Sequence, residues 1–356
     1  MIQKILFSPS YWTKAWALSL LCSISCFAQI GGKDAFQFLQ LPASPHVAGI
    51  GGENVSVRDR SVGTVWQNPA LLSDTMNHDL MLTVHPYYAG IFHSHLQYAT
   101  RIKNSGLWSF GLAYFNYGKM DQTLANGTVV GTFNPNEFAI SASKSHTIGL
   151  FSIGGTLKFA ASQITSGYSA AAILADAGGS FKHPKQDWTI GLVVKNIGFP
   201  VKNYYENENI TTPFDVQLGT TFKPAHLPLR ISITAQKLYQ FDISYNDPSL
   251  NKQVTFDGTS EIKEESVLSK GFRHLVIGTE LLLSKNFHFR IGYNSLIRRD
   301  LRLQTKAGVA GISWGFMLRV KKFEFSFTRA YYHVVGGTNY IGLVVNTSDL
   351  FTRKNK

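Results

Sequence analysis

Cysteine and long apolar runs are almost absent from this chain. Cys22 and Cys26 are its two cysteines in 356 residues. Both fall within residues 1–28, so the rest of the chain has no disulfide framework, no thiol catalysis and no cysteine-bound metal. The apolar run Ala15–Leu21 is too short to cross a bilayer as a helix, and no longer run follows it. The sequence therefore predicts no helical membrane anchor after residue 28.

Residues 1–28 predict a secretion signal. Lys4 and Lys14 precede the apolar run, and Cys26-Phe27-Ala28 places small residues at the two positions that a signal peptidase reads. We expect cleavage between Ala28 and Gln29, so the chain leaves the cytoplasm. A lipoprotein signal is the alternative, but neither cysteine has a leucine three residues before it together with a small residue just before it.

Patterns for catalysis and metal binding are also scarce. Residues 311–315 match the hydrolase pattern G-x-S-x-G, but Ser313 falls in the middle of a predicted strand. That pattern works on a turn between a strand and a helix, and no helix is predicted here. His93 and His95 form a pair without further ligands at metal-site spacing, so we expect them at a loop edge without a metal. We expect no catalytic residue, no metal and no cofactor, and hence no enzyme.

Positive charge exceeds negative charge, with a formal net charge of +12. Lysine and arginine are spread along the chain and form no compact basic motif. Nucleic-acid binding is therefore a poor inference for an exported chain. Anionic lipopolysaccharide or an acidic partner is the expected counterpart of this charge.

Alternation of apolar and polar residues dominates residues 78–347. From residue 151 to residue 159, for example, apolar residues occupy the odd positions and Ser, Gly, Thr and Lys the even ones. A soluble sandwich also alternates, but these segments are about 9–12 residues long, which suits a tilted crossing of a bilayer. The sequence predicts an all-β fold, a 14-stranded antiparallel outer-membrane barrel. The predicted strands are 78–86, 94–103, 106–117, 135–145, 148–164, 168–182, 187–198, 212–223, 227–239, 271–284, 286–294, 308–320, 322–333 and 338–347.

The connections between these strands alternate between tight turns and generally longer loops. Such barrels place short turns in the periplasm and long loops outside. We therefore expect the N-terminal segment and the C-terminal tail 348–356 on the periplasmic side. The predicted loops near 118–134, 199–211, 240–270 and 295–307 are our candidate partner-binding surfaces, and 240–270 is the longest of them. The loop 240–270 contains an acidic run and 295–307 is basic. Their candidate residues are Tyr245, Asp247, Glu261, Glu264, Glu265, Arg298, Arg299 and Arg302.

Residues 29–77 do not alternate and are rich in glycine. This segment predicts a hatch, with one short helix near Ser61–Gln67, that fills the barrel. The lumen is expected to be polar and salt-bridged, although a selective channel is the alternative. The charged residues expected on the inner face are Arg101, Glu137, Lys158, Lys195, Asp215, Arg230, Glu280, Arg290, Arg319 and Glu324.

The hatch segment carries a family resemblance. Its residues Gly49, Gly51, Gly52, Asn68, Pro69 and Ala70 stand in a pattern similar to the hatch of FadL-like outer-membrane proteins, which are plugged barrels of fourteen strands. Residues 31–44 resemble more particularly the start of the PorQ family, a component of the type IX secretion system of Bacteroidetes. One departure is the end of the chain, where Phe351 is followed by five further residues.

The resemblance implies a scaffold in the attachment complex of that secretion system. Its implied partners are a PorZ-like surface protein, the PorU sortase and the barrel PorV, and the attached cargo is fixed to lipopolysaccharide. The alternative function is a FadL-like importer of hydrophobic small molecules. An importer needs an apolar pocket inside the barrel. The predicted lumen is polar and charged, although the hatch residues Phe36, Phe38 and Leu39 could line such a pocket.

Overall fold

The computed structural model describes residues 34–206, 210–244, 252–254, 260–262, 266–300, 308–333 and 336–348. The predicted signal, with Ala28 and Gln29, lies outside the described residues, as does most of the predicted C-terminal tail.

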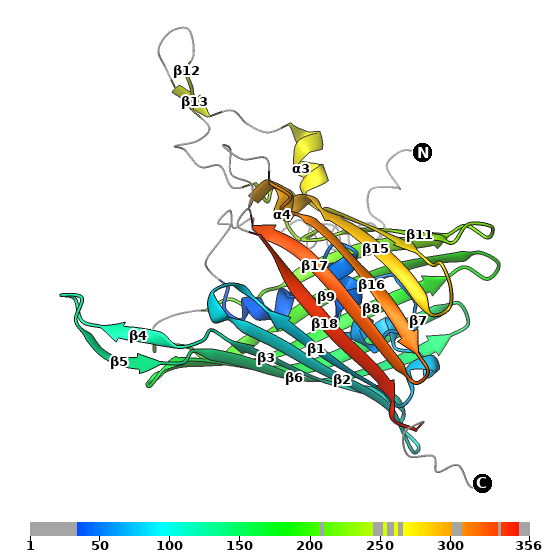
Figure 1. The fold of residues 1–356 in the computed structure, drawn as a ribbon, viewed down its shortest axis with the longest axis horizontal. Helices are drawn as coiled ribbons and strands as arrows, with labels where there is room; N and C mark the ends of the chain where they lie inside the picture. Colours follow the sequence, from blue (N-terminus) through cyan, green and yellow to red (C-terminus); the bar gives the residue numbers. More distant parts are fainter. Residues whose placement is uncertain are drawn as a thin grey trace, which may run out of the picture. The chain divides into compact units, whose positions relative to one another are not determined.

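Fourteen antiparallel strands close into one barrel (Figure 1). The first strand, β1, pairs with the last, β18, with Asp79 opposite Asn346, and this pairing completes the closure. The predicted fold class is therefore confirmed. In chain order the barrel strands are β1 (Asp79–Pro86), β2 (Phe92–Ile102), β3 (Gly106–Asn116), β6 (Asn136–Ile148), β7 (Phe151–Thr165), β8 (Tyr168–Lys182), β9 (Asp187–Lys202), β10 (Asp215–Lys223), β11 (Leu229–Ala235), β14 (Leu275–Leu281), β15 (Phe287–Asn294), β16 (Ile312–Val320), β17 (Phe323–His333) and β18 (Gly336–Asn346).

The outer surface of the barrel is apolar, as the alternation predicts. On β7, the outward residues Phe151, Ile153 and Leu157 are 57–61% exposed. The inward residues Ser152 and Lys158 are each 1% exposed. An apolar belt on the outside of a closed barrel is the construction of outer-membrane proteins, because every backbone group is paired and the belt faces lipid. The chain is thus an outer-membrane β-barrel. Among the described residues, no helix is long and apolar enough to cross a membrane.

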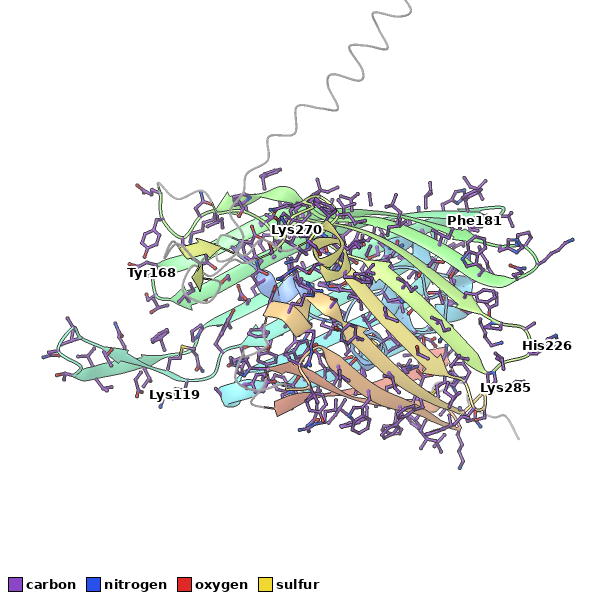
Figure 2. The ribbon with its side chains drawn as sticks, turned by 90° about the horizontal axis from the view of Figure 1, so that it is seen from above. Lys119, Tyr168, Phe181, His226, Lys270 and Lys285 are labelled. Atoms are coloured by element: carbon purple, nitrogen blue, oxygen red, sulfur yellow. The ribbon has the colours of Figure 1, made fainter. Side chains whose placement is uncertain are left out.

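The wall of the barrel is uneven in height. Strands β7 and β8 have 15 residues each and β9 has 16, whereas β11 and β14 have 7 each. The two ends of the barrel also differ. Figure 2 shows Phe181, His226 and Lys285 at one end, here called the turn end, and Lys119 and Tyr168 at the opposite loop end.

Residues 34–77, here called the plug, lie inside the barrel. Helix α2 (Pro45–Gly49) packs against β15 to β18, and η3 (Pro69–Leu71) packs against β6 to β8. The remaining short helices of the plug are η1 (Gln37–Gln40), η2 (Val62–Trp66) and η4 (Asp74–Met76). The predicted helix near Ser61–Gln67 is the 3-10 helix η2.

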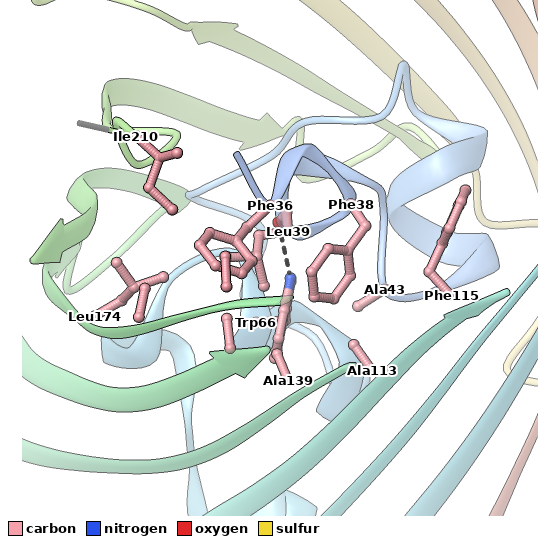
Figure 3. Packing of buried hydrophobic residues seen from close by; sticks show 13 residues of the cluster. Phe36, Phe38, Leu39, Ala43, Trp66, Ala113, Phe115, Ala139, Leu174 and Ile210 are labelled. Atoms are coloured by element: carbon pink, nitrogen blue, oxygen red, sulfur yellow. Dashed lines mark hydrogen bonds between the residues drawn. The ribbon is translucent and has the colours of Figure 1, made fainter. Parts of the chain in front are cut away.

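An apolar cluster joins the plug to the wall of β3 and β8 (Figure 3). Phe36, Phe38 and Trp66 of the plug are at most 4% exposed, and they pack with Phe115 and Leu174 of the strands. The Trp66 indole donates a hydrogen bond to the backbone oxygen of the plug residue Leu39 at 3.4 Å. The inner face of the barrel is therefore apolar in this region, whereas the sequence predicted a polar lumen.

Further elements lie in the connections at the loop end. They are the hairpin of β4 (Met120–Thr123) and β5 (Val129–Phe133), the hairpin of β12 (Lys252–Val254) and β13 (Ser260–Ile262), and the helices η5 (Tyr88–Gly90), α3 (Val267–Arg273) and α4 (Ser295–Asp300). The predicted strand 271–284 was wrong at its start, because α3 continues to Arg273 and β14 begins only at Leu275. Ser266 caps this helix by accepting a hydrogen bond from the backbone N–H of Ser269.

Candidate functional site

Glycines on the inner wall let the plug backbone approach closely. A Cβ atom at Gly191 would lie 1.9 Å from the backbone oxygen of Val55, and one at Gly292 would lie 2.0 Å from the backbone nitrogen of Gly51. Gly51 itself has φ +104°, a conformation that other residues rarely adopt. Both the plug and the wall therefore need glycine where they touch.

The predicted hatch residues Asn68, Pro69 and Ala70 fix one turn of the plug to the wall. The Asn68 side chain accepts a hydrogen bond from the Ala70 N–H at 3.0 Å, which caps η3. Its amide nitrogen donates to the backbone oxygens of Val55 at 2.8 Å and of Gly179 at 3.2 Å. One side chain thus ties two parts of the plug to strand β8, and asparagine supplies the donor and the acceptor that this requires.

A buried ion pair lies beside the tryptophan of the plug. Lys158 Nζ on β7 is 2.6 Å from Asp176 Oδ2 on β8, and both side chains are at most 1% exposed. Lys158 also donates to Asn196 Oδ1 at 3.0 Å and lies 4.7 Å from the centre of the Trp66 ring. Removing one member of such a pair leaves the other charged and buried, which destabilises the fold strongly.

A second cation reaches from the wall into the plug. Lys195 Nζ donates to Gln67 Oε1 at 2.9 Å and lies 3.6 Å from Glu53 Oε2. Glu53 also accepts a hydrogen bond from Gln217 at 3.2 Å. Burial raises the pKa of Glu53 above its ordinary value, although the Lys195 charge opposes this shift. The plug is therefore held by charged contacts as well as by packing.

A third network joins three strands to the plug. Glu280 on β14 lies 2.8 Å from Arg230, 3.2 Å from Arg290 and 3.1 Å from the plug residue His46. Arg230 also lies 2.8 Å from the plug residue Asp59. His46, Asp59 and Glu280 lie close enough together to hold a metal ion, and they are the only such group of histidine, cysteine and acidic residues among the described residues. Two guanidinium groups already satisfy its carboxylates, so the donor set fits an ion-pair network better than a cation site.

Histidines line the inner wall near the first strands. His93 and His95 were expected at a loop edge, but both lie within β2 and are 1% exposed. Their neighbour His85 is stacked on Tyr340, with ring centres 3.6 Å apart, and its Nε2 is 2.9 Å from the Thr338 hydroxyl. These imidazoles fill the wall between plug and strands, and the described residues add no acidic or cysteine ligand there.

Ser313 is the second residue of β16, and its side chain is buried. The strand continues to Val320 and turns directly into β17, so the strand-to-helix elbow of hydrolases is missing at this serine. The geometry therefore gives Ser313 no catalytic environment.

The rim at the loop end is built from helices α3 and α4. Arg273 Nη1 of α3 lies 2.7 Å from Asp300 of α4, and Arg299 of α4 hydrogen bonds to Ser269 of α3. Arg298 donates to the backbone oxygen of Gly308. The two candidate arginines, Arg298 and Arg299, therefore hold the rim together and are half-buried.

An acidic residue that follows β11 pairs with the middle of α3. Lys270 Nζ lies 2.6 Å from Asp242, and hydrogen bonds from Lys270 and Ser244 lower the pKa of Asp242 to about 2. Of the other candidate loop residues, Tyr245, Asp247, Glu264, Glu265 and Arg302 lie outside the described residues, and Glu261 is described only as part of β13.

Most of the charged residues expected in the lumen are buried there. The prediction was wrong for Arg101, Arg319 and Glu324, which lie at the turn end of the barrel. Arg101 is half exposed and pairs with Asp74 at 2.5 Å, and Arg319 pairs with Glu324 at 2.6 Å. Strand ends are the least certain part of a sequence prediction, so residues at the rim were assigned to the lumen. The sequence did not predict Asp176 and Glu53 as the partners of Lys158 and Lys195, because a sequence does not indicate which cation a carboxylate will contact.

Comparisons with known proteins give likenesses only to solved structures. No family model and no curated protein matches the chain. The toluene transporter TodX of Pseudomonas putida is 10% identical, with a TM-score of 0.48, and the match covers 85% of this chain and 96% of that one. A FadL homologue of Pseudomonas aeruginosa is 10% identical, with a TM-score of 0.47 over 85% of this chain and 98% of that one.

The channel CymD, described as a monoaromatic hydrocarbon channel, is 13% identical with a TM-score of 0.49, covering 87% of this chain and 97% of that one. At such identities and scores these likenesses say nothing about what this chain binds or transports.

Proposed function

We propose that this protein is a plugged outer-membrane scaffold of the PorQ type, a component of the type IX secretion system. In this function it holds a PorZ-like surface protein at its loop end and works beside the PorU sortase and PorV. The observation that carries the proposal is the filled lumen: the plug is fixed to the wall by three groups of buried charges and by wall glycines. A barrel that is filled in this way offers its outer rim, not its interior, for contact.

The rim has the features of a docking surface. The β4–β5 hairpin extends beyond the barrel, and Leu124, Val129 and Val130 near its tip are 51–55% exposed (Figure 1). On α3, Val267 and Leu268 are 71% and 77% exposed. Exposed apolar side chains at a rim that faces water are a marker of protein contacts. The proposal places the turn end in the periplasm, following the rule for bacterial barrels.

A deletion strain tests the scaffold function. We expect loss of this protein to stop surface attachment of sorted cargo while uptake of fatty acids stays normal. The physical test is a pull-down from the outer membrane with the full-length protein. We expect recovery of a large surface partner, and loss of that partner when the β4–β5 hairpin or residues 240–270 are trimmed. A deletion strain that anchors its cargo normally would refute the scaffold function.

A second candidate is an importer of hydrophobic small molecules, favoured by one observation. The cluster around Phe36, Phe38, Trp66 and Phe115 is an apolar region inside the barrel, where an importer would hold its cargo. In the structure this region is packed with side chains, so import requires the plug to move. Fatty acid that copurifies with the protein, and that is lost in Phe38→Asp but not in the control Leu124→Asp at the exposed hairpin tip, would favour the importer.

A further inference from the structure

A cavity of about 890 Å³ opens at the turn end between plug and wall. Arg58 and Thr75 of the plug line one side, and the other side is formed by the β6–β7 and β8–β9 connections, with Thr147, Leu150, Lys182 and His183. Cavities of this size hold small organic ligands. The scaffold function makes no use of this space.

Arg58 is the unusual residue of the cavity. Its neighbours in sequence are engaged: Asp59 lies 2.8 Å from Arg230, and Arg60 lies 3.2 Å from Asp79. Arg58 is half-buried, and the described residues provide it with no hydrogen bond and no ion pair. Burial lowers the pKa of the Arg58 guanidinium below its ordinary value. An anion in the cavity would compensate this charge.

The opposite wall carries a second cation. Lys182 is the last residue of β8 and lines the cavity, and within the part of the chain that the structure describes it has no ion pair. Of the charged residues that line the space, Arg60 is paired with Asp79 and Asp59 with Arg230, so Arg58 and Lys182 supply its uncompensated charge among the described residues. The field in the cavity is therefore positive, and it attracts anions.

The uncharged residues that line the cavity indicate which kind of anion would fit it. Ser73, Thr75 and Thr147 offer hydroxyl groups, while Leu150 and Pro184 offer an apolar surface. A guanidinium, an ammonium and hydroxyls are the groups that bind phosphate, and the apolar surface suits an organic body attached to it. We propose that this cavity is a binding site for a small organic phosphate ester.

Titration calorimetry of the purified full-length protein in detergent tests the site, with n-butyl phosphate as the probe. We expect saturable binding that weakens with added NaCl, and no binding of n-butanol. Arg58→Gln should lower the affinity by about tenfold or more, because it removes charge-assisted hydrogen bonds. Lys182→Gln should weaken it several-fold, and Arg58→Lys should retain part of it.

Lys285→Gln is the matched control, because Lys285 is an exposed lysine at the same end (Figure 2) and does not line the cavity. It should bind the probe like the unchanged protein. The heat-dependent gel mobility of each variant reports that its barrel is closed. Equal losses in Arg58→Gln and Lys285→Gln would overturn the site in favour of general surface charge. Absence of binding, or unchanged binding in Arg58→Gln, would also overturn it. Inorganic phosphate binding as tightly as the ester would refute recognition of the organic body.

Discussion

At the scale of single residues, the inner wall needs glycine at some positions and long charged side chains at others. Where the plug backbone touches the wall, the wall residue has no side chain, as at Gly191 and Gly292. Where space remains, long charged side chains such as Lys158 and Lys195 reach inward and find partners. The specificity of the plug position therefore rests on glycines and buried ions together.

Lys158→Met tests the buried ion pair. The substitution keeps the length of the side chain but leaves Asp176 buried without its cation, so we expect a loss of about 3–5 kcal/mol in the free energy of unfolding. The control is Arg101→Met, which breaks a half-exposed pair and should cost at most about 1 kcal/mol. Chemical unfolding followed by tryptophan fluorescence measures both. Similar losses in the two variants would contradict the importance given to burial.

Gly191→Ala tests the close approach of the plug. A Cβ at this position overlaps the backbone oxygen of Val55, which cannot rotate away as a side chain does. We expect the plug to be displaced locally, with faster hydrogen exchange of residues 53–58 and an overpacking cost of about 1–3 kcal/mol. Gly179→Ala, where a Cβ meets nothing within 4 Å, should leave exchange in the plug unchanged. Unaltered exchange in Gly191→Ala would show that the wall yields instead.

At the scale of elements, helices α3 and α4 replace what the sequence presented as two long loops. They are joined by Arg273 and Asp300, and Lys270 ties α3 to Asp242. The β4–β5 hairpin, by contrast, forms a separate two-stranded sheet outside the barrel. The rim thus contains one braced part and one part with exposed strand edges, and the edges are open to pairing with another chain.

Removing the β4–β5 hairpin should show whether this part of the rim serves binding rather than folding. Replacement of residues 120–133 by a short Gly-Ser turn removes β4 and β5 but no barrel strand, so the barrel should close and unfold as before. Under the scaffold proposal, binding of the surface partner should fall strongly. Gel mobility after heating and the pull-down measure the two effects. Loss of barrel closure in this variant would instead show that the hairpin contributes to folding.

The accuracy of prediction from sequence also differs between elements. All fourteen barrel strands were predictable because each has two faces in different solvents, and the alternation of Phe151, Ile153 and Leu157 is a direct result. Helices α3 and α4 were not predictable, because they have 7 and 6 residues, which is too few for a helical repeat of apolar residues to be recognised. The partners of Lys158 and Arg230 were also hidden, since a partner depends on strand register and on a plug distant in sequence.

At the scale of the whole molecule, the filled lumen makes a prediction about conduction. In planar bilayers the intact barrel should show no steady ion conductance, because packed side chains and ion pairs occupy its interior. Removal of residues 34–76 should open a pore and give discrete conductance steps. The control is the intact protein with Lys285→Gln, a change at an exposed lysine of the turn end, which should stay silent. Steady conductance of the unmodified protein would contradict a closed lumen.

The uneven wall has a consequence for the surrounding lipid. Strand β9 exceeds β11 by nine residues, 16 against 7, which at the usual rise and tilt corresponds to a height difference of about 20 Å. Outward residues of the tall side stay apolar toward the loop end, where Phe199 is 63% exposed. A bilayer of uniform thickness cannot match both sides. The lipid must thin beside β11 and β14, or the barrel must lean, and either response gives neighbouring membrane proteins a preferred side on which to gather.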